Sequence, residues 1–580
     1  MNIRNTRLFA LSLCIFLFLA ACGPEKPKET APEKFEVTMR LPAEPTGLNS
    51  IVNRDGMKGL VLQYIMFQPL TIDNESLNIF PMVAKNMPIV NRMADSSVHV
   101  TLELRPEARW DDGSAVTVAD VVFSLKLCIL PWISNGAIKG GFADVEDVLL
   151  TPGNDHKYTV VFKRPYFLAS IIAGDINLFP KYKYDPQGVL DAYTIPQIQN
   201  NDPKLMADSA VKRFAEAFNS EKYSREIVEG CGPYKLEKWE AGKRIVLRKK
   251  ENWWGNSFTN NGSFFKAYPD KITFEIIKDE NTAINALKAG TIDGMASVDF
   301  KTFTQTLQKD AALQQNFDFH TPDMLAFEYL GLNARRPLLK DRAMRKALAY
   351  TVDADRIIST LMYGLGKRIK GHITQNRPEE VSNQLVLNEF NIQKADVLLD
   401  SLGWKDTNGD GIREKGGRKN TLKLNLLVNA GNERREKTAL LIRDDMKKAG
   451  VDVNIEIMEM GAYINALSKG NFDMVLSGTV GSALESDPYQ LWHTASAGGN
   501  FTGFGNAYSD SLIMAFRVEM DPKQRIEISK KLQEEIQRFG SVIFLNDMKE
   551  RIVFSKKFEE LTVSEQRPGF WLGSLRKKPR

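Results

Sequence analysis

The chain has 580 residues, of which 43% are hydrophobic and 26% are charged, and its formal net charge is +5. This is the composition of an ordinary globular protein, and the length allows about three or four folding units of roughly 150 residues each. The net charge is too small for the basic footprint of a nucleic-acid-binding protein, so we expect no nucleic-acid partner.

The N-terminus has the features of an export signal. The basic segment MNIRNTR precedes the short apolar run LFALSLCIFLFLA and the sequence LAAC, which ends at Cys22. The apolar run is well below the roughly 20 residues of a membrane-spanning helix, so residues 1–21 are predicted to be a signal peptide. Leu-Ala-Ala before Cys22 resembles the bacterial lipobox, in which the cysteine becomes the diacylated first residue. An ordinary signal peptide with an incidental cysteine is the alternative.

The segment after Cys22 predicts a tether. Residues 22–34 are rich in Pro, Lys and Glu and too polar to bury a core. The folded part would then lie outside the cytoplasm, periplasmic or at the cell surface, held to a membrane by the lipid. In such an oxidising compartment Cys128 and Cys231 could form a disulfide, but the preferred interpretation is that both are small buried residues.

Further along, a strand, a turn and a helix follow one another. The stretch VHVTLELR (98–105) alternates apolar and polar residues and predicts a half-buried strand. Thr117 and Asp120 have capping-box spacing and begin a predicted helix with an apolar stripe. Between the predicted strand and the predicted helix, Asp111 and Asp112 lie in the segment DDGS, where the chain needs a tight turn. Neighbouring carboxylates in a turn point in different directions, so the pair is interpreted as turn residues rather than as catalytic acid and base.

Strand-like alternation and helical periodicity are interleaved along the whole chain, which indicates an α/β protein. No G-x-S-x-G, H-E-x-x-H or phosphate-binding loop is present, and the histidines are scattered. We therefore expect that the protein is not an enzyme. An exported hydrolase is the alternative, because a catalytic triad is assembled in space rather than in sequence.

The segment DTNGDGIREKGG is the sharpest candidate for a metal site. Asp406, Asn408 and Asp410 occupy positions 1, 3 and 5 of a calcium-binding loop, with glycine at position 6. Position 12 is glycine instead of the closing glutamate, although Glu414 at position 9 could contribute a ligand. A polar turn is preferred and calcium is the alternative, so no cofactor is expected.

Seven segments, in this order, resemble the family 5 extracellular solute-binding proteins, which serve dipeptide, oligopeptide and related ABC importers. They are PAEPTGLN (42–49), MFQPLTID (66–73), ELRPEARWDDGSAVTVADVVFSLKL (103–127), GCGPYKLEKWEAGKRIVLRKKENWWG (230–255), ALKAGTIDG (286–294), YLGLNARRPLLKDRAMRKALAYTVDADRII (329–358) and ADVLLDSLGWKDTNGDGIREK (395–415). In the fourth segment Cys231 stands where the family usually has threonine.

The resemblance implies a two-lobed, periplasmic-binding-protein-like (type II) α/β fold with an extra subdomain in the first lobe and the ligand enclosed between the lobes. The implied layout is signal peptide 1–21, lipidated tether 22–34, lobe I 35–72, extra subdomain of lobe I 73–225, lobe I 226–282, lobe II 283–544 and lobe I return 545–580. The polar-faced helical stretch 200–226 fits no standard family segment and is interpreted as an insertion.

The resemblance also implies a ligand site. In peptide-binding relatives, an aspartate four residues before a proline pairs with the peptide's α-amino group. Here Pro488 matches that proline but Leu484 stands at the aspartate position, which leaves Glu485 and Asp487 as the available carboxylates. The candidate ligand-binding residues are Glu44, Asn49, Tyr64, Asn333, Glu485, Asp487, Tyr489 and Trp492. A turn-opening role is the alternative for Asp487, and core packing is the alternative for Trp492.

The resemblance therefore implies a monomeric, lipid-anchored protein that captures a small peptide between two lobes and delivers it to the permease of an ABC importer. Ligand binding would stabilise the closed form of the two lobes. The same fold binding a metal chelate or a glycan is one alternative. A surface lipoprotein for adhesion or sensing is another.

Overall fold

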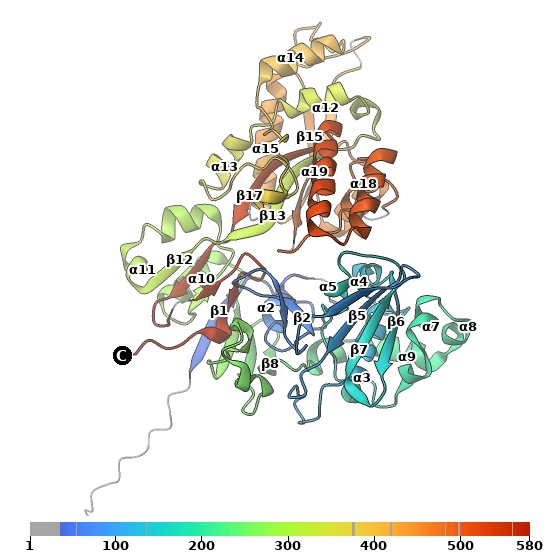
Figure 1. Cartoon of the computed structure of the whole chain (residues 1–580). Coiled ribbons are helices and arrows are strands. Elements are labelled where there is room, and N and C mark those ends of the chain that lie inside the picture. The colour runs from blue at the N-terminus through green and yellow to red at the C-terminus, as the bar shows by residue number, and fades with distance from the viewer. Residues whose placement is uncertain are drawn as a thin grey trace, which may run out of the picture.

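The computed structural model describes residues 35–579 except 54, 135, 374–376, 418–419, 482, 497–498 and 560. The predicted signal peptide, Cys22 and the tether lie outside the described residues. Figure 1 shows two lobes, one above the other, each built around its own sheet, with a further sheet and its helices beside the lower lobe. Within the described part of the chain, no helix has both the length and the apolar character that crossing a membrane requires.

Lobe I, the lower one, is built on a seven-stranded sheet of order β12-β18-β11-β1-β10-β9-β8. The strands are β1 (Glu36–Leu41), β8 (Tyr234–Glu240), β9 (Arg244–Lys249), β10 (Lys271–Ile276), β11 (Gly294–Met295), β12 (Phe317–His320) and β18 (Ile552–Ser555). In central β1 the alternating residues Val37, Met39 and Leu41 are fully buried, as the two-residue period of a strand requires. The sheet thus brings β1, from the start of the chain, together with β18, from near its end, in one lobe.

The rest of lobe I covers this sheet and lines its edge towards lobe II. It comprises α2 (Met57–Leu62), the pair β2 (Leu70–Ile72) and β3 (Ile79–Pro81), α10 (Glu280–Lys288), α11 (Ala311–Asn316), and the pair β19 (Thr562–Val563) and β20 (Phe570–Trp571). Tyr64 and Trp571, far apart in sequence, stack with ring centroids 4.6 Å apart in the core. The C-terminal segment is therefore an integral part of lobe I.

The extra subdomain has a four-stranded antiparallel sheet of order β4-β5-β7-β6. Its elements are β4 (Ile89–Arg92), β5 (Val98–Glu103), β6 (Val145–Thr151), β7 (Asn154–Phe162), α3 (Val118–Ile129), α4 (Gly136–Gly141), α5 (Ala169–Ile172), α6 (Lys181–Tyr184), α7 (Ile195–Gln199), α8 (Pro203–Ala207) and α9 (Ser209–Phe218). The predicted strand is confirmed as β5. The predicted helical stretch 200–226 contains α8 and α9.

The predicted turn between β5 and α3 is also confirmed. The Ser114 amide donates to Asp112 Oδ1 at 2.9 Å, and Gly113 takes the left-handed conformation with φ +85°. Asp111 instead turns to Lys250 Nζ at 2.5 Å. The capping box forms as predicted, with Asp120 Oδ2 accepting from the Thr117 amide at 2.9 Å. The two neighbouring carboxylates point to different partners and do not converge on a common site.

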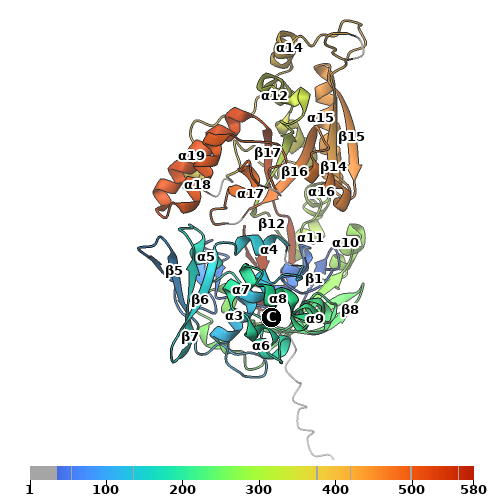
Figure 2. The same ribbon diagram turned by 90° about the vertical axis from the view of Figure 1, so that its right-hand side faces the viewer.

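Lobe II has a five-stranded sheet of order β15-β14-β16-β13-β17. Its elements are β13 (Asp323–Leu332), β14 (Lys423–Asn429), β15 (Asp452–Met458), β16 (Met474–Val480), β17 (Val542–Lys549), α12 (Arg342–Ala349), α13 (Ala354–Leu361), α14 (Ile392–Ser401), α15 (Glu433–Lys448), α16 (Met460–Lys469), α17 (Tyr489–Trp492), α18 (Ala507–Val518) and α19 (Pro522–Phe539). Figures 1 and 2 both show α18 and α19 on the side of lobe II that faces the extra subdomain.

Strand pairing places the two chain crossovers between the lobes later in the sequence than the layout implied by the resemblance. Residues 294–320 contribute β11 and β12 to the lobe I sheet, so the lobe II sheet begins with β13 at Asp323 rather than near residue 283. The return to lobe I follows β17, which ends at Lys549. The two residues of β11 and the four of β12 are too short to show the alternation that predicts a strand.

Short single turns complete the fold. They are the 3₁₀ turns η1 (Val189–Ala192), η3 (Trp254–Phe258), η4 (Ser263–Phe265), η6 (Pro337–Leu339), η7 (Pro378–Glu380) and η8 (Leu572–Ser574), and the π turns η2 (Lys222–Glu226) and η5 (Thr302–Leu307). Cys128 and Cys231, both in the described part of the chain, are buried thiols that form no disulfide. Burial raises the pKa of each thiol to about 12, which is the environment predicted for small buried residues.

Candidate ligand-binding cleft

A cavity of about 590 Å³ lies where sequence-distant parts of lobe I meet the crossovers to lobe II. Its walls come from α2, β2, the residues after α5, the crossover residues Ser297 and Glu550, and the C-terminal segment 566–568. Gln566 Oε1 also accepts from the Ala483 amide of lobe II at 3.4 Å. The cavity therefore borders the junction of the two lobes.

A second pocket, of about 250 Å³, lies on the lobe II side. The end of β16 and the loop after it form one wall, and apolar side chains of α17, α18 and α19 form another. Of the predicted ligand-binding residues, Glu485, Asp487 and Trp492 line this pocket. Mostly apolar walls with a few placed polar groups are typical of small-molecule sites.

Both predicted carboxylates are paired within lobe II. Arg525 Nε donates to Glu485 Oε2 at 2.7 Å. Arg517 Nε donates to Asp487 Oδ2 at 2.8 Å, while Asp487 Oδ1 accepts from the Tyr489 amide at 2.9 Å, as in a turn. Each carboxylate is thus already neutralised by a guanidinium.

Asp487 also joins the lobes. Tyr166 of the extra subdomain donates its hydroxyl hydrogen to Asp487 Oδ2 at 2.8 Å. The Phe167 amide donates to the Arg517 carbonyl at 3.0 Å, and the Phe167 ring lies 4.9 Å from that of Phe516. Burial and the adjacent carboxylate raise the pKa of Tyr166, which keeps its hydroxyl a donor. We call these five residues the rim contact; it joins the extra subdomain to lobe II.

Glu44 and Asn49 hold local structure inside lobe I. Glu44 Oε1 accepts from Trp239 Nε1 at 2.8 Å, and its Oε2 accepts from the Gly242 amide at 3.1 Å, so it fixes the β8–β9 hairpin. Asn49 is buried, and its Oδ1 accepts from the Ile51 amide at 3.0 Å. Neither residue lines the two pockets.

Tyr64 and Asn333 are likewise buried in their lobes. The Tyr64 hydroxyl accepts from the Leu572 amide at 3.0 Å and so ties the C-terminal segment to lobe I. Asn333 Nδ2 donates to the Phe472 carbonyl at 3.1 Å beside β16. Neither lines the two pockets, so the structure gives both a role inside their own lobes.

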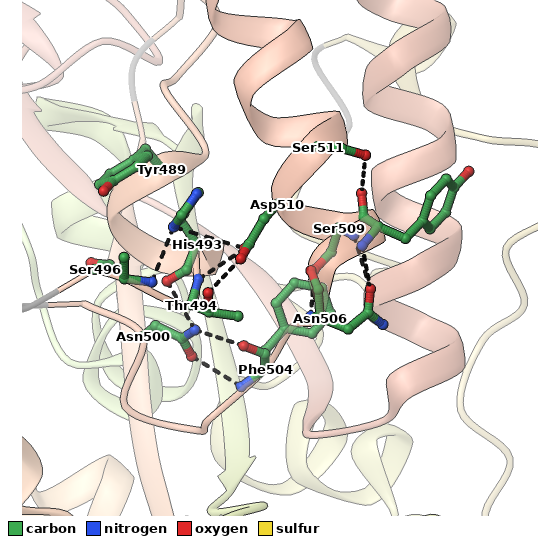
Figure 3. Close-up of polar contacts among 12 residues, drawn as sticks. Tyr489, His493, Thr494, Ser496, Asn500, Phe504, Asn506, Ser509, Asp510 and Ser511 are labelled. Carbon is green, nitrogen blue, oxygen red and sulfur yellow. Dashed lines mark hydrogen bonds and ion pairs between the residues drawn. The ribbon is translucent and has the colours of Figure 1, made fainter.

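Tyr489 and Trp492 are the first and last residues of α17, which leads towards α18. Trp492 is buried and packs against Phe504, with ring centroids 5.5 Å apart, while Tyr489 stacks on His493 at 4.4 Å. Figure 3 shows the polar contacts that fix this connection, including Asp510 Oδ1, which accepts from the Thr494 amide at 3.0 Å. Trp492 therefore combines core packing with a place on the pocket wall.

In the candidate calcium loop, Asp406 and Asp410 accept hydrogen bonds from the loop's own backbone. Asp406 Oδ1 and Oδ2 accept from the Gly409 and Gly411 amides at 2.7 and 2.9 Å. Asp410 Oδ1 accepts from the Ile412 amide at 2.8 Å, and Asn408 Oδ1 from the Asp410 amide. Glu414 is buried, and its Oε1 accepts from the Thr407 amide at 3.0 Å. Within the described residues, no three or more His, Cys, Asp or Glu side chains are grouped for a metal ion.

Sequence reasoning missed the polar residues of the larger cavity. Asp175 and Gln68 lie on its wall, and Gln68 Nε2 donates to Asp175 Oδ1 at 2.9 Å. Glu550 lies on the crossover after β17. The available signal was that Asp175 is the single charged residue in the apolar stretch ASIIAGDINLFP.

Comparison with known proteins agrees with this architecture. The chain is 25% identical over 565 residues to the oligopeptide-binding protein AppA of Bacillus subtilis, covering 94% of each protein. It is 26% identical over 514 residues to the periplasmic murein peptide-binding protein MppA of Escherichia coli, covering 85% of this chain and 84% of MppA.

Solved structures share the fold. AppA from B. subtilis in complex with a nonapeptide superposes with a TM-score of 0.71 at 22% identity, covering 94% of this chain and 100% of that one. NikA from Brucella suis in complex with Fe(III)-EDTA gives 0.75 at 19% identity, with the same coverage. The family model "Bacterial extracellular solute-binding proteins, family 5 Middle" matches residues 81–501. The chain therefore belongs to the family 5 bacterial extracellular solute-binding proteins.

Proposed function

We propose that the protein captures a small peptide between its lobes and delivers it to an ABC-type importer. The observation that carries this proposal is the cavity of about 590 Å³ at the lobe junction. The rim contact joins the same two lobes through the extra subdomain. Ligand held there would stabilise the closed arrangement over more open ones. The permease would then recognise the closed form, and no covalent bond is made or broken.

The relatives support a peptide as the ligand. AppA is named as an oligopeptide-binding protein and MppA as a murein peptide-binding protein. The cavity volume lies within the range of small-molecule sites, and its walls mix apolar side chains with a few polar ones. In lobe II, Glu485, Asp487 and Trp492 line the second pocket, and Tyr489 lies on the same helix as Trp492. These four are kept as candidate ligand contacts, as are Glu44, Asn49, Tyr64 and Asn333.

The proposal also includes the location of the protein in the cell. A lipid on Cys22 and the polar tether would hold a monomer at a membrane, on its periplasmic or outer face, within reach of the permease. Cleavage before Cys22 and acylation are tested by mass spectrometry of the N-terminal peptide from membrane fractions. A Cys22→Ser variant should lose the lipid mass and leave the membrane fraction.

A metal chelate is the second candidate ligand. NikA, whose structure superposes well, was solved with Fe(III)-EDTA. Its cleft has the same two-lobed frame, so the fold alone is compatible with either kind of solute.

Calorimetric titration of the unlipidated Cys22→Ser protein separates the candidates. Pools of di- to pentapeptides should give saturable heat, and Fe(III)-EDTA and nickel–histidine should not. Heat from a chelate without heat from any peptide would replace the peptide by a chelate. No heat from either, with the protein shown to be folded, would contradict both and direct the search to glycans.

A further inference from the structure

Three titratable side chains line the cavity of about 590 Å³ among the described residues: Asp175, Glu550 and Arg567. Glu550 is occupied, because its carboxylate accepts from the Ser297 amide at 3.0 Å, the Ser297 hydroxyl at 3.1 Å and the Arg551 amide at 2.8 Å. These bonds hold the crossover between the lobes. Glu550 therefore has a structural use that accounts for its charge.

Asp175 differs from Glu550. Its Oδ1 accepts one hydrogen bond from the neutral Gln68 amide, and no Lys, Arg or His of the described chain lies within ion-pair distance. The charged and titratable groups near it are the Cys128 thiol and, across the cavity, Glu550 and Arg567. A carboxylate so placed has no internal partner for its negative charge.

The position of Asp175 is fixed by the backbone around it. Its amide donates to the Ile171 carbonyl at 2.7 Å at the end of α5, and the Leu70 amide of β2 donates to the Gly174 carbonyl at 2.9 Å. A Cβ at Gly174 would come within 2.4 Å of the Leu70 side chain, so α5 and β2 approach as closely as glycine allows. The carboxylate is thus presented to the cavity by a rigid support.

The environment of Asp175 makes its charge costly. The side chain is exposed to the cavity, and desolvation by the surrounding protein raises its pKa to about 6. A cation entering the cavity would relieve this cost through a charge-assisted hydrogen bond. An asparagine could accept the same bond from Gln68, so the observed hydrogen bonding alone gives no reason for a carboxylate.

We propose that Asp175 binds a positively charged group of the ligand, a primary ammonium or a guanidinium, from the lobe I side of the cleft. The proposal rests on the proposed function only in taking the cavity as the ligand site, and it names the chemical class of that ligand as cationic. Asp175 Oδ1 accepts the hydrogen bond from Gln68, which leaves Asp175 Oδ2 for the ligand.

Protonation of Asp175 then controls affinity. Only the ionised carboxylate attracts a cation, so affinity is full above about pH 6 and falls by up to about tenfold per pH unit below it. The ligand's ammonium stays protonated below about pH 7. Asp175 is therefore the group expected to titrate.

The test uses the unlipidated Cys22→Ser protein and two matched pairs of probes. Trialanine is compared with N-acetyl-trialanine by calorimetry, and n-butylammonium with n-butanol by thermal shift at millimolar concentration. The Asp175→Asn variant is compared with Glu216→Gln, which removes the same charge from the exposed surface of α9. Because the asparagine side chain would keep the Gln68 bond without the costly charge, ligand-free Asp175→Asn should melt no lower than the parent.

We expect the parent and the Glu216→Gln variant to prefer each ammonium probe over its neutral partner. Asp175→Asn should lower affinity for the ammonium by at least about tenfold and abolish the pH dependence between about pH 5 and about pH 7. Ammonium binding that survives in Asp175→Asn, or that Glu485→Gln removes instead, would overturn the assignment. So would the absence of ammonium binding. Butylammonium binding that needs Asp175, without any peptide binding, would uphold the site and contradict the peptide function.

Discussion

The lobe I cavity and the lobe II pocket differ in how their carboxylates are neutralised. Every carboxylate that lines the lobe II pocket pairs with an arginine: Glu380 with Arg377, Glu485 with Arg525, and Asp487 with Arg517. On the lobe I side, Asp175 has an amide for a partner and, within the described chain, no cation. The difference lies in neutralisation, since all four side chains border a pocket.

This contrast separates two uses of a carboxylate. A partly buried carboxylate paired with arginine holds a wall together, and losing the arginine leaves an uncompensated charge. A carboxylate kept without a cation costs stability in the free protein and is available to a ligand. The comparison therefore separates the carboxylates of lobe II, whose arginine pairs stabilise that lobe, from Asp175, whose proposed role is ligand recognition.

The largest expected effect comes from removing an arginine on the lobe II side. Arg525→Met should lower the free energy of unfolding by about 2–3 kcal/mol, because Glu485 is left without its cation in a site where its side chain is only 17% exposed. Chemical denaturation measures the loss. The double variant Glu485→Gln/Arg525→Met should recover part of it, as expected for two groups in contact. A loss below about 0.5 kcal/mol in the single variant would contradict a structural role for the Arg525–Glu485 pair.

A change of opposite sign in the free energy of unfolding is expected on the lobe I side, where removing the charge of Asp175 should stabilise the protein. The pKa of Asp175 is about 6 when folded, above its ordinary 3.8, so the folded chain holds the proton more tightly than the unfolded chain. The parent should therefore lose stability relative to Asp175→Asn as pH rises from about 4 to about 6. Allowing for access of cavity water, the gain in Asp175→Asn at neutral pH should be about 1 kcal/mol. Equal pH profiles for the two proteins would contradict an unneutralised carboxylate.

A smaller effect is expected at the rim contact, where the extra subdomain touches lobe II. Tyr166→Phe keeps the ring beside Arg517 but removes the hydroxyl that donates to Asp487 Oδ2. The free energy of unfolding should fall by about 0.5–1 kcal/mol. The ligand-free protein should also open more, which small-angle scattering measures as a larger radius of gyration. An unchanged radius would show that the rim contact does not hold the lobes.

Local rules explain what could be predicted from the sequence. The β5 strand, the DDGS turn and the Thr117–Asp120 capping box depend on residues within a few positions of one another, and all three are confirmed. The two-lobed fold followed from the order of seven family-like segments. Propensity and spacing act over short distances, so such features are visible in one sequence.

The site depends on contacts that no local pattern encodes. Tyr166 and Asp487 are 321 positions apart, and Gln68 and Asp175 are 107 apart. Glu485 and Asp487 were predicted as ligand carboxylates because their sequence position is suggestive. Arg517 and Arg525, which neutralise them, follow in α18 and α19, where an exposed and an inward arginine look alike in sequence. The difference between the lobe I cavity and the lobe II pocket therefore appears only in the folded chain.

The smallest effect is expected from the loop 406–417, which shows a third use of carboxylates. Asp406 and Asp410 are satisfied by backbone amides of their own turn, so a cation is not needed to balance their hydrogen bonding. Replacing calcium by a chelator should shift the Tm by less than about 1 °C, because a ligand stabilises only when it binds the folded state. A shift of several degrees, present in the parent and absent in Asp406→Asn, would instead establish a calcium site. It would also show that carboxylates bonded to backbone amides can still recruit a cation, which would weaken the use of hydrogen-bond satisfaction to separate structural from ligand-binding charges.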